Sequence, residues 1–105
     1  MAANFHAGRT WTLFQSNGVD VKLNLTQNSD GQLFGSATTS AGPVGTLDNG
    51  AAVTGEDIFF VIAWSDGKKG RYQGRRGADH QLSGDTFNVF NPGDHSTWAT
   101  QEKFD

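Results

Sequence analysis

The segment VDVKLNLTQ, residues 19–27, alternates apolar and polar side chains without interruption. Its apolar positions are Val19, Val21, Leu23 and Leu25. Successive side chains of a β-strand point to opposite faces, so a period of two predicts a strand with one buried face. This segment gives the clearest indication of the fold class, which is all-β.

The residues just before it, RTWTLFQ at 9–15, form another strand candidate with Trp11 and Leu13 on one face. Ser16-Asn17-Gly18 joins the two segments, and Asn-Gly tolerates the positive φ angles of a tight hairpin turn. We therefore expect these strands to pair antiparallel.

Further strand candidates follow at short intervals, and no segment indicates a helix. They span residues 32–40, 44–55, 57–64, 69–76, 81–90 and 96–104. The run DIFFVIAW at 57–64 is continuously apolar, which predicts a strand lined on both sides. Its outer side must then be covered, for example by a partner subunit, so we expect a homo-oligomer.

The pattern Asp-x-Gln-Leu-x-Gly occurs at residues 30–35 and again at 79–84, each time after a polar turn. We interpret it as one hairpin device used twice, with the glycine allowing the strand to bend. Antiparallel sheets without covering helices remove their edges by closing into barrels. The prediction is a single antiparallel up-and-down β-barrel of about eight strands. Residues 1–105 form one domain, in which residues 1–8 are expected to be a flexible N-terminal tail.

Composition argues against several classes of function. The chain has no cysteine, and therefore neither a disulfide nor a thiolate nucleophile. Its formal net charge of −3 argues against nucleic-acid binding. The basic cluster at 68–76 is interpreted as a solvated strand whose cations discourage edge pairing. No run has the length of a signal peptide or a membrane span, so we expect a soluble protein without membrane contact, cytoplasmic or secreted without a leader.

Catalytic and metal-binding patterns are weak. Asp94-His95-Ser96 contains the residue types of a hydrolase triad, but three consecutive side chains point in different directions. His6, His80 and His95 are scattered without the spacing of metal ligands. We expect a non-catalytic protein with no cofactor and no metal.

Several short motifs occur in a fixed order along nearly the whole chain. They are Thr10-Trp11, residues 30–36, residues 60–64, Tyr72-Gln73-Gly74, Leu82-Ser83-Gly84 and Trp98-Ala99-Thr100. This series resembles the avidin and streptavidin family. The resemblance implies a barrel that forms dimers or tetramers and holds biotin in its mouth between tryptophans, with Trp64 and Trp98 at two matching positions.

The same resemblance points to three positions that would hold the ureido oxygen of biotin. The family places an asparagine, a serine and a tyrosine there, and this chain has Leu13, Asn17 and Ala37. A buried ureido oxygen costs about 1–3 kcal/mol for each hydrogen bond that it lacks, which argues against tight biotin binding.

The residues favour ligand binding over catalysis. Sugars are held by aromatic rings that stack on the sugar and by amide and carboxylate groups that bond its hydroxyls. The candidate ligand-binding residues are Trp64, Tyr72, Asn88, Asn91, Asp94, His95 and Trp98. We predict a lectin-like barrel for a carbohydrate or another small polar ligand. There are two alternatives. The first is a barrel that binds a biotin-type ligand in its mouth, and the second is a protein-interaction or inhibitor barrel that docks through residues 68–76 or a loop tip.

The polar loop before the last strand has a turn signature of its own. Asn91-Pro92-Gly93-Asp94 places proline second and glycine third, which is typical of a β-turn. We therefore expect the chain to reverse at residues 91–94, with His95 and Trp98 following it. Trp64 and Trp98 each suit a position at the barrel rim and a position in the core equally well.

Overall fold

The computed structural model describes residues 3–105, which form β-strands joined by short connections. The strands are β1 (Thr10–Gln15), β2 (Asp20–Gln27), β3 (Leu33–Thr39), β4 (Val44–Leu47), β5 (Ala52–Thr54), β6 (Asp57–Trp64), β7 (Lys69–Arg76), β8 (Leu82–Asn88) and β9 (Asn91–Thr100). No helix that could cross a membrane occurs within these described residues.

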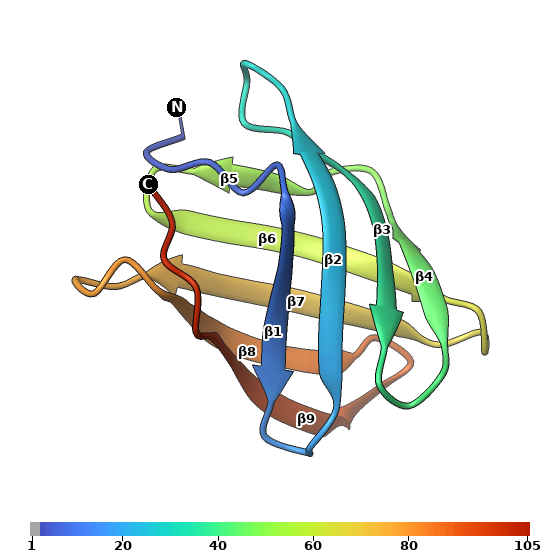
Figure 1. Cartoon of the computed structure of the whole chain (residues 1–105). Helices are drawn as coiled ribbons and strands as arrows, with labels where there is room; N and C mark the ends of the chain where they lie inside the picture. Colours follow the sequence, from blue (N-terminus) through green and yellow to red (C-terminus); the bar gives the residue numbers. More distant parts are fainter. Residues whose placement is uncertain (1–2) are drawn as a thin grey trace.

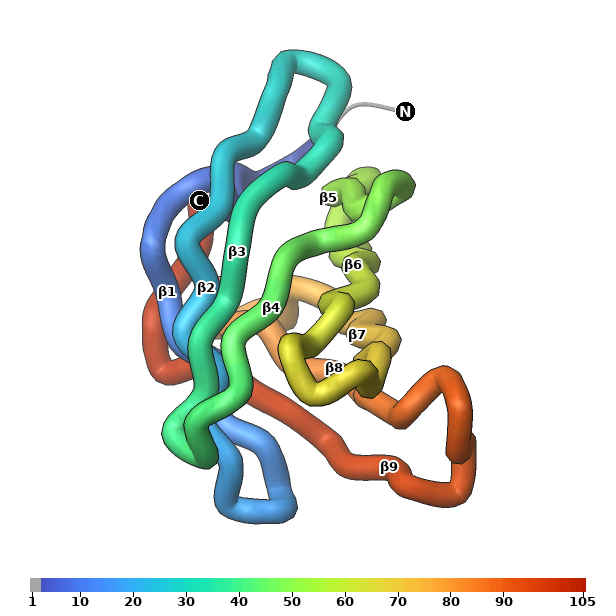
Figure 2. Tube along the Cα trace, turned by 90° about the vertical axis from the view of Figure 1, so that its right-hand side faces the viewer, coloured from blue at the N-terminus to red at the C-terminus, as the bar shows by residue number. Residues whose placement is uncertain are grey.

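The strands close into an eight-stranded antiparallel barrel with up-and-down order (Figure 1). Strand β1 pairs with β9, where Leu13 lies opposite Thr100. Strand β4 pairs with the end of β6, and β5 pairs with the beginning of β6, so β4 and β5 share one place in the wall. The turned view in Figure 2 shows β1–β4 on one side and β6–β8 on the other, with β9 below them. The predicted fold class is confirmed.

Most predicted strand ranges agree with the structure, and those of β6 and β7 agree at both ends. The clearest difference is the predicted turn at residues 91–94, which is wrong. The chain reverses instead at Val89-Phe90, and residues 91–94 already belong to β9. The Asn88 Oδ1 atom accepts a hydrogen bond from the Phe90 backbone N–H at 3.0 Å, so asparagine stabilises this earlier turn.

A column of six aromatic side chains fills the barrel from one end toward the other. Its members are Phe5, Phe104, Trp11, Phe60, Tyr72 and Trp98. At its centre the rings of Phe60 and Tyr72 stack, with centroids 4.9 Å apart and planes 9° from parallel. Buried leucine, isoleucine and valine side chains surround the column. The barrel interior is therefore a packed core, and room for a ligand remains only near its end.

The residues expected to form a flexible tail pack against the barrel where the structure describes them, and residues 1 and 2 lie outside the described residues. Phe5 and Ala7 are buried, and the Ala7 carbonyl accepts a hydrogen bond from Trp11 Nε1 at 3.0 Å. Arg76 lies over the Phe5 ring at 5.3 Å and pairs with Glu56 at 2.9 Å. Phe5 is thus held by the aromatic column on one side and by a guanidinium on the other.

The outer side of β6 is covered in part by the neighbouring strand. The Arg71 guanidinium lies 5.1 Å from the Phe59 ring centroid and 5.7 Å from that of Phe87. Strand β7 hydrogen-bonds to β6 and β8 on its two sides, so its cations do not protect an edge as the sequence had suggested. Arg71 instead places its charge over apolar rings, which is favourable through cation–π contact.

The repeated pattern Asp-x-Gln-Leu-x-Gly forms two equivalent hairpins. In one, the Gly31 N–H bonds to the Asn28 carbonyl at 3.0 Å, and in the other the His80 N–H bonds to the Gly77 carbonyl at 3.0 Å. Gly31 has a φ of 83°, and His80 has a φ of 66° at the matching position. Glycine adopts this left-handed conformation freely, whereas a side chain at φ > 0 strains the backbone.

Replacing His80 by glycine is therefore expected to stabilise the protein. Relief of about 1–2 kcal/mol of backbone strain exceeds the roughly 0.5–1 kcal/mol that glycine adds to the entropy of the unfolded chain. Urea unfolding of H80G should give a free energy of unfolding higher by about 0.5–1 kcal/mol. Conversely, Gly31→Ala should lower the free energy of unfolding. The alanine would strain the backbone at this positive φ, and its Cβ would lie only 2.4 Å from the Val53 carbonyl oxygen. A less stable H80G would contradict this account.

Candidate functional site at the barrel mouth

Two adjoining hollows open at the end of the barrel where the β1–β2, β3–β4, β6–β7 and β8–β9 connections meet, and we call them together the mouth site. The first has a volume of about 110 Å³ and is lined by Gln15, Asn17, Trp64, Lys68, Lys69, Gly70, Thr86, Phe87, Asn88, Asp94 and Ser96. The second has a volume of about 180 Å³ and is lined by Gln15, Val19, Val21, Thr39, Ala41, Pro43, Trp64, Asp66, Lys68 and Tyr72. Gln15, Trp64 and Lys68 belong to both, so the two hollows share part of their walls.

The floor of the mouth site is a fixed chain of hydrogen bonds above the aromatic column. The Tyr72 hydroxyl donates to Gln15 Oε1 at 2.6 Å, and Gln15 Nε2 donates to Asn17 Oδ1 at 3.2 Å. Asn17 Oδ1 also accepts the Val19 N–H at 3.0 Å. Burial raises the pKa of Tyr72 to about 12, so the phenol is neutral and acts as a donor. These bonds hold the Gln15 amide in one orientation.

Gln15 was not among the predicted site residues, although the sequence carries a signal for it. Trp11 and Leu13 were predicted on the inner face of the first strand, and Gln15 is the next residue in that alternation. A polar residue that follows two apolar ones on the inner face marks the place where the core ends and the mouth begins. Ser96 lies on the same inner face of β9 as the buried Trp98, two residues nearer the mouth.

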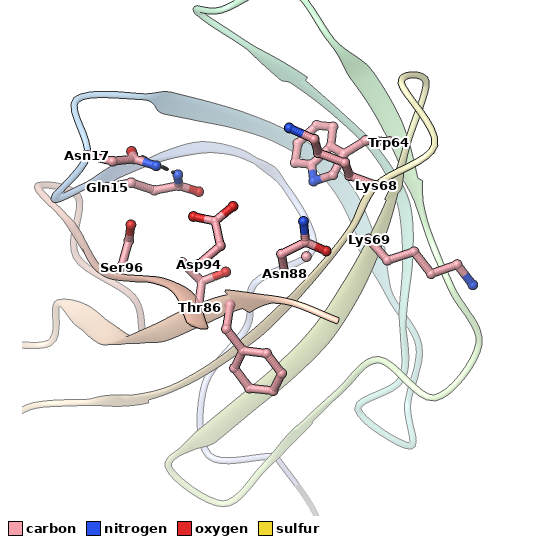
Figure 3. Close-up of a pocket in the computed structure, with 11 residues that line it drawn as sticks. Gln15, Asn17, Trp64, Lys68, Lys69, Thr86, Asn88, Asp94 and Ser96 are labelled. Atoms are coloured by element: carbon pink, nitrogen blue, oxygen red, sulfur yellow. Dashed lines mark hydrogen bonds between the residues drawn. The ribbon is translucent and has the colours of Figure 1, made fainter. Parts of the chain in front are cut away.

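A bulge in β9 positions the acidic side of the mouth site. Phe87 of β8 lies opposite His95, but the next residue, Asn88, lies opposite Asn91. Pro92, Gly93 and Asp94 are therefore extra residues on β9. Bulges commonly redirect a side chain near functional sites. Figure 3 shows the Asp94 carboxylate pointing into the space between Gln15 and Asn88.

Trp64 forms the apolar side of the mouth site at the end of β6, and it is partly buried. Gly45 and Gly70 leave room for its indole ring. A Cβ at Gly45 would lie 2.9 Å from the Trp64 ring, and a Cβ at Gly70 would lie 3.3 Å from its Nε1 atom. Val19 and Pro43 continue the apolar surface in the second hollow. The site thus pairs an aromatic wall with a polar wall.

The structure brings some of the predicted site residues together and separates others. Trp64, Asn88 and Asp94 line the first hollow, and Tyr72 lines the second. Trp98 is only 2% exposed and belongs to the aromatic column, where its Nε1 donates to the Asp85 carbonyl at 3.1 Å. The sequence left both a rim and a core position open for Trp98, and the structure places it in the core.

Asn91 and His95 lie away from the mouth site. Asn91 is exposed at the end of the β8–β9 hairpin and lines neither hollow. His95 alternates with the inward Asp94 and Ser96, so it faces outward, and its Nε2 lies 3.5 Å from Asp85 Oδ1. The three consecutive residues Asp94, His95 and Ser96 therefore do not converge on one point. Within residues 3–105 no group of three or more His, Cys, Asp or Glu side chains is placed to hold a metal ion.

Comparison with known proteins assigns no relative. No protein-family model matches the chain, and no curated protein matches it. Two positions to which the avidin resemblance points, Leu13 and Ala37, are buried in the barrel interior and offer only apolar side chains there.

The buried phenol of Tyr72 predicts an alkaline loss of stability. Its pKa is raised to about 12 in the folded protein, against about 10 for an exposed tyrosine. The folded state therefore keeps its proton longer than the unfolded state does. The resulting contribution to the free energy of unfolding is fully present below about pH 10. As the pH rises toward 12, the free energy of unfolding falls by up to about 2 kcal/mol.

Denaturant unfolding between pH 9 and pH 12 should show this loss in the natural protein and a smaller one in Y72F, which lacks the ionisable group. Tyr72 is the only tyrosine of the chain, so phenolate absorbance in the folded protein reports on it alone. A phenolate midpoint near pH 10, or equal alkaline losses in the two proteins, would contradict the buried donor role.

Proposed function

We propose that this protein is a non-catalytic binding protein that takes a small polar ligand, most simply a sugar, at the barrel mouth. One observation carries the proposal: the mouth site sets the Trp64 indole against polar side chains above a floor fixed by Tyr72 and Gln15. Specific sites for small polar molecules combine an apolar wall with a few placed hydrogen-bonding groups.

The dimensions of the mouth site favour a ligand with a single ring. Its hollows measure about 110 and 180 Å³, whereas sites for drug-sized ligands begin at roughly 300 Å³. The aromatic column closes the interior below Tyr72, so a longer ligand would have to extend outward into solvent. A monosaccharide, or the terminal sugar of a chain, suits such a shallow site.

The polar wall keeps hydrogen-bonding capacity for such a ligand. Within the described residues, Asn88 Nδ2, the Asp94 carboxylate oxygens and Ser96 Oγ form no hydrogen bond with another group of the protein. Gln15, by contrast, is engaged at both ends of its amide. An amide donor beside a carboxylate suits neighbouring hydroxyls, because each hydroxyl both donates and accepts.

A biotin-type ligand remains a weaker proposal for the same site. The antiparallel eight-stranded architecture is compatible with an avidin-like barrel. Leu13 and Ala37, however, offer no donors where that resemblance expects two of the ureido contacts. A buried ureido oxygen would then lack partners worth about 1–3 kcal/mol each, which favours a ligand held at the rim.

Binding of monosaccharides should be measured by isothermal titration calorimetry, with Trp64→Ala as the test variant. Loss of the stacking wall is expected to weaken binding about fivefold to tenfold. Phe14→Ala is the matched control, because Phe14 is an exposed aromatic residue that lines neither hollow. Equal affinities in the natural protein and W64A, or no binding of any monosaccharide at millimolar concentration, would reject the proposal.

A protein partner is the second candidate, and the β8–β9 hairpin tip favours it. Phe90 is 67% exposed and Val89 is 39% exposed, side by side at this tip. The basic strand β7 is a poorer candidate surface, because Lys69, Arg75 and Arg76 each form an ion pair within the chain. A protein captured by the natural chain and lost with Phe90→Ser, while W64A retains it, would support the tip as the docking site.

A further inference from the structure

The charged groups around the mouth site differ in whether the chain itself satisfies them. Lys69 Nζ lies 2.9 Å from Asp48 Oδ2, and Figure 3 shows its side chain extending away from the other labelled residues. The Asp94 carboxylate forms no hydrogen bond and no ion pair with any of residues 3–105, and it lines the first hollow. Its carboxylate therefore presents two unused acceptors to whatever occupies the mouth.

The groups that flank Asp94 are not placed to neutralise it. On one side, Gln15 Nε2 donates to Asn17 and Gln15 Oε1 accepts from the Tyr72 hydroxyl. These two bonds hold the Gln15 amide in place. Asn88, on the other side, accepts from Phe90, which fixes the orientation of its amide. Lys68 lies across the site beside Trp64, on the β6–β7 connection (Figure 3).

We propose that the mouth site selects ligands that carry an amine, with Asp94 accepting the ammonium group while the ring of the ligand lies against Trp64. This inference rests on the proposed function and names its ligand class, an amino sugar in preference to a neutral one. A carboxylate binds an ammonium through charge-assisted hydrogen bonds, which are shorter and stronger than those to a neutral hydroxyl. Trp64 and Asp94 line the same hollow of about 110 Å³, so one small ring can contact both.

The bulge in β9 supplies the structural reason for this selectivity. With regular pairing beyond Phe87 and His95, Asn88 would lie opposite Asp94 within an ordinary ladder. The extra residues Pro92, Gly93 and Asp94 instead form a projection at the mouth. A Cβ built at Gly93 would lie 3.8 Å from the nearest atom, Asn91 Oδ1, so the projection is loosely packed. The Asp94 carboxylate therefore reaches the mouth site without a hydrogen-bonding partner from the protein.

The test compares glucosamine with glucose by isothermal titration calorimetry at pH 6.5, where the amine of glucosamine is protonated. We expect glucosamine to bind the natural protein at least about tenfold more tightly, the scale of one charge-assisted hydrogen bond. Asp94→Asn should abolish this preference, so that glucosamine and glucose bind the variant with affinities within about threefold of each other. N-acetylglucosamine, whose nitrogen is uncharged, should behave like glucose.

Asp85→Asn is the matched control, because Asp85 is an aspartate of the adjacent strand that lines the outer wall rather than the mouth site. It should keep the full preference for glucosamine. Circular dichroism and thermal unfolding of both variants establish that they are folded.

The possible outcomes separate this inference from the function on which it rests. Equal binding of glucosamine and glucose, or a preference that survives in D94N, overturns the role of Asp94 while sugar binding stands. Failure of glucosamine, glucose and N-acetylglucosamine to bind at millimolar concentration overturns the proposed sugar site and this inference with it.

Discussion

The stacked pair of Phe60 and Tyr72 is the contact on which the rest of the molecule depends. Their rings lie 4.9 Å apart at the centre of the barrel, and Trp98 packs against both. Small barrels must fill their interior with side chains, and planar rings do so with few voids. Because Tyr72 ends this packing with a hydroxyl, the same contact defines the core below and the polar floor above, through its bond to Gln15.

The mouth site arises where the regular sheet is interrupted. Gly45 and Gly70 remove side chains that would collide with Trp64, and the bulge at Pro92–Asp94 adds residues that the ladder does not need. Regular strands commit their side chains to the core or the outer wall in strict alternation. Only local departures from that alternation leave aromatic and acidic groups facing the same small space.

The chain satisfies most of its exposed charge internally, and this gives Asp94 its significance. Arg76 pairs with Glu56, whose pKa is lowered by hydrogen bonds from Arg76 and Asn4. Arg71 rests on two phenylalanine rings, and Lys69 pairs with Asp48. Such exposed pairs contribute little stability individually. Within residues 3–105 the carboxylates of Asp20 and Asp30 also lack a partner, but of these three only Asp94 lines the mouth site.

Most of the strands could be predicted from the sequence. Alternation in residues 19–27 and the apolar run at 57–64 predicted strands that the structure contains. The connections are short, and a sheet of such strands removes its unpaired edges by closing into a barrel. Trp64, Asn88 and Asp94 were also recognised as candidates, because their residue types suit ligand contacts. Which aromatic rings belong to the core depends on the tertiary structure. Trp64 ends β6 and is partly buried, whereas Trp98 lies within β9 and is buried by cross-strand packing against Phe60. The tertiary structure also moved the turn to Val89-Phe90, because the pairing of β8 with β9 overrides the local preference of Pro92-Gly93.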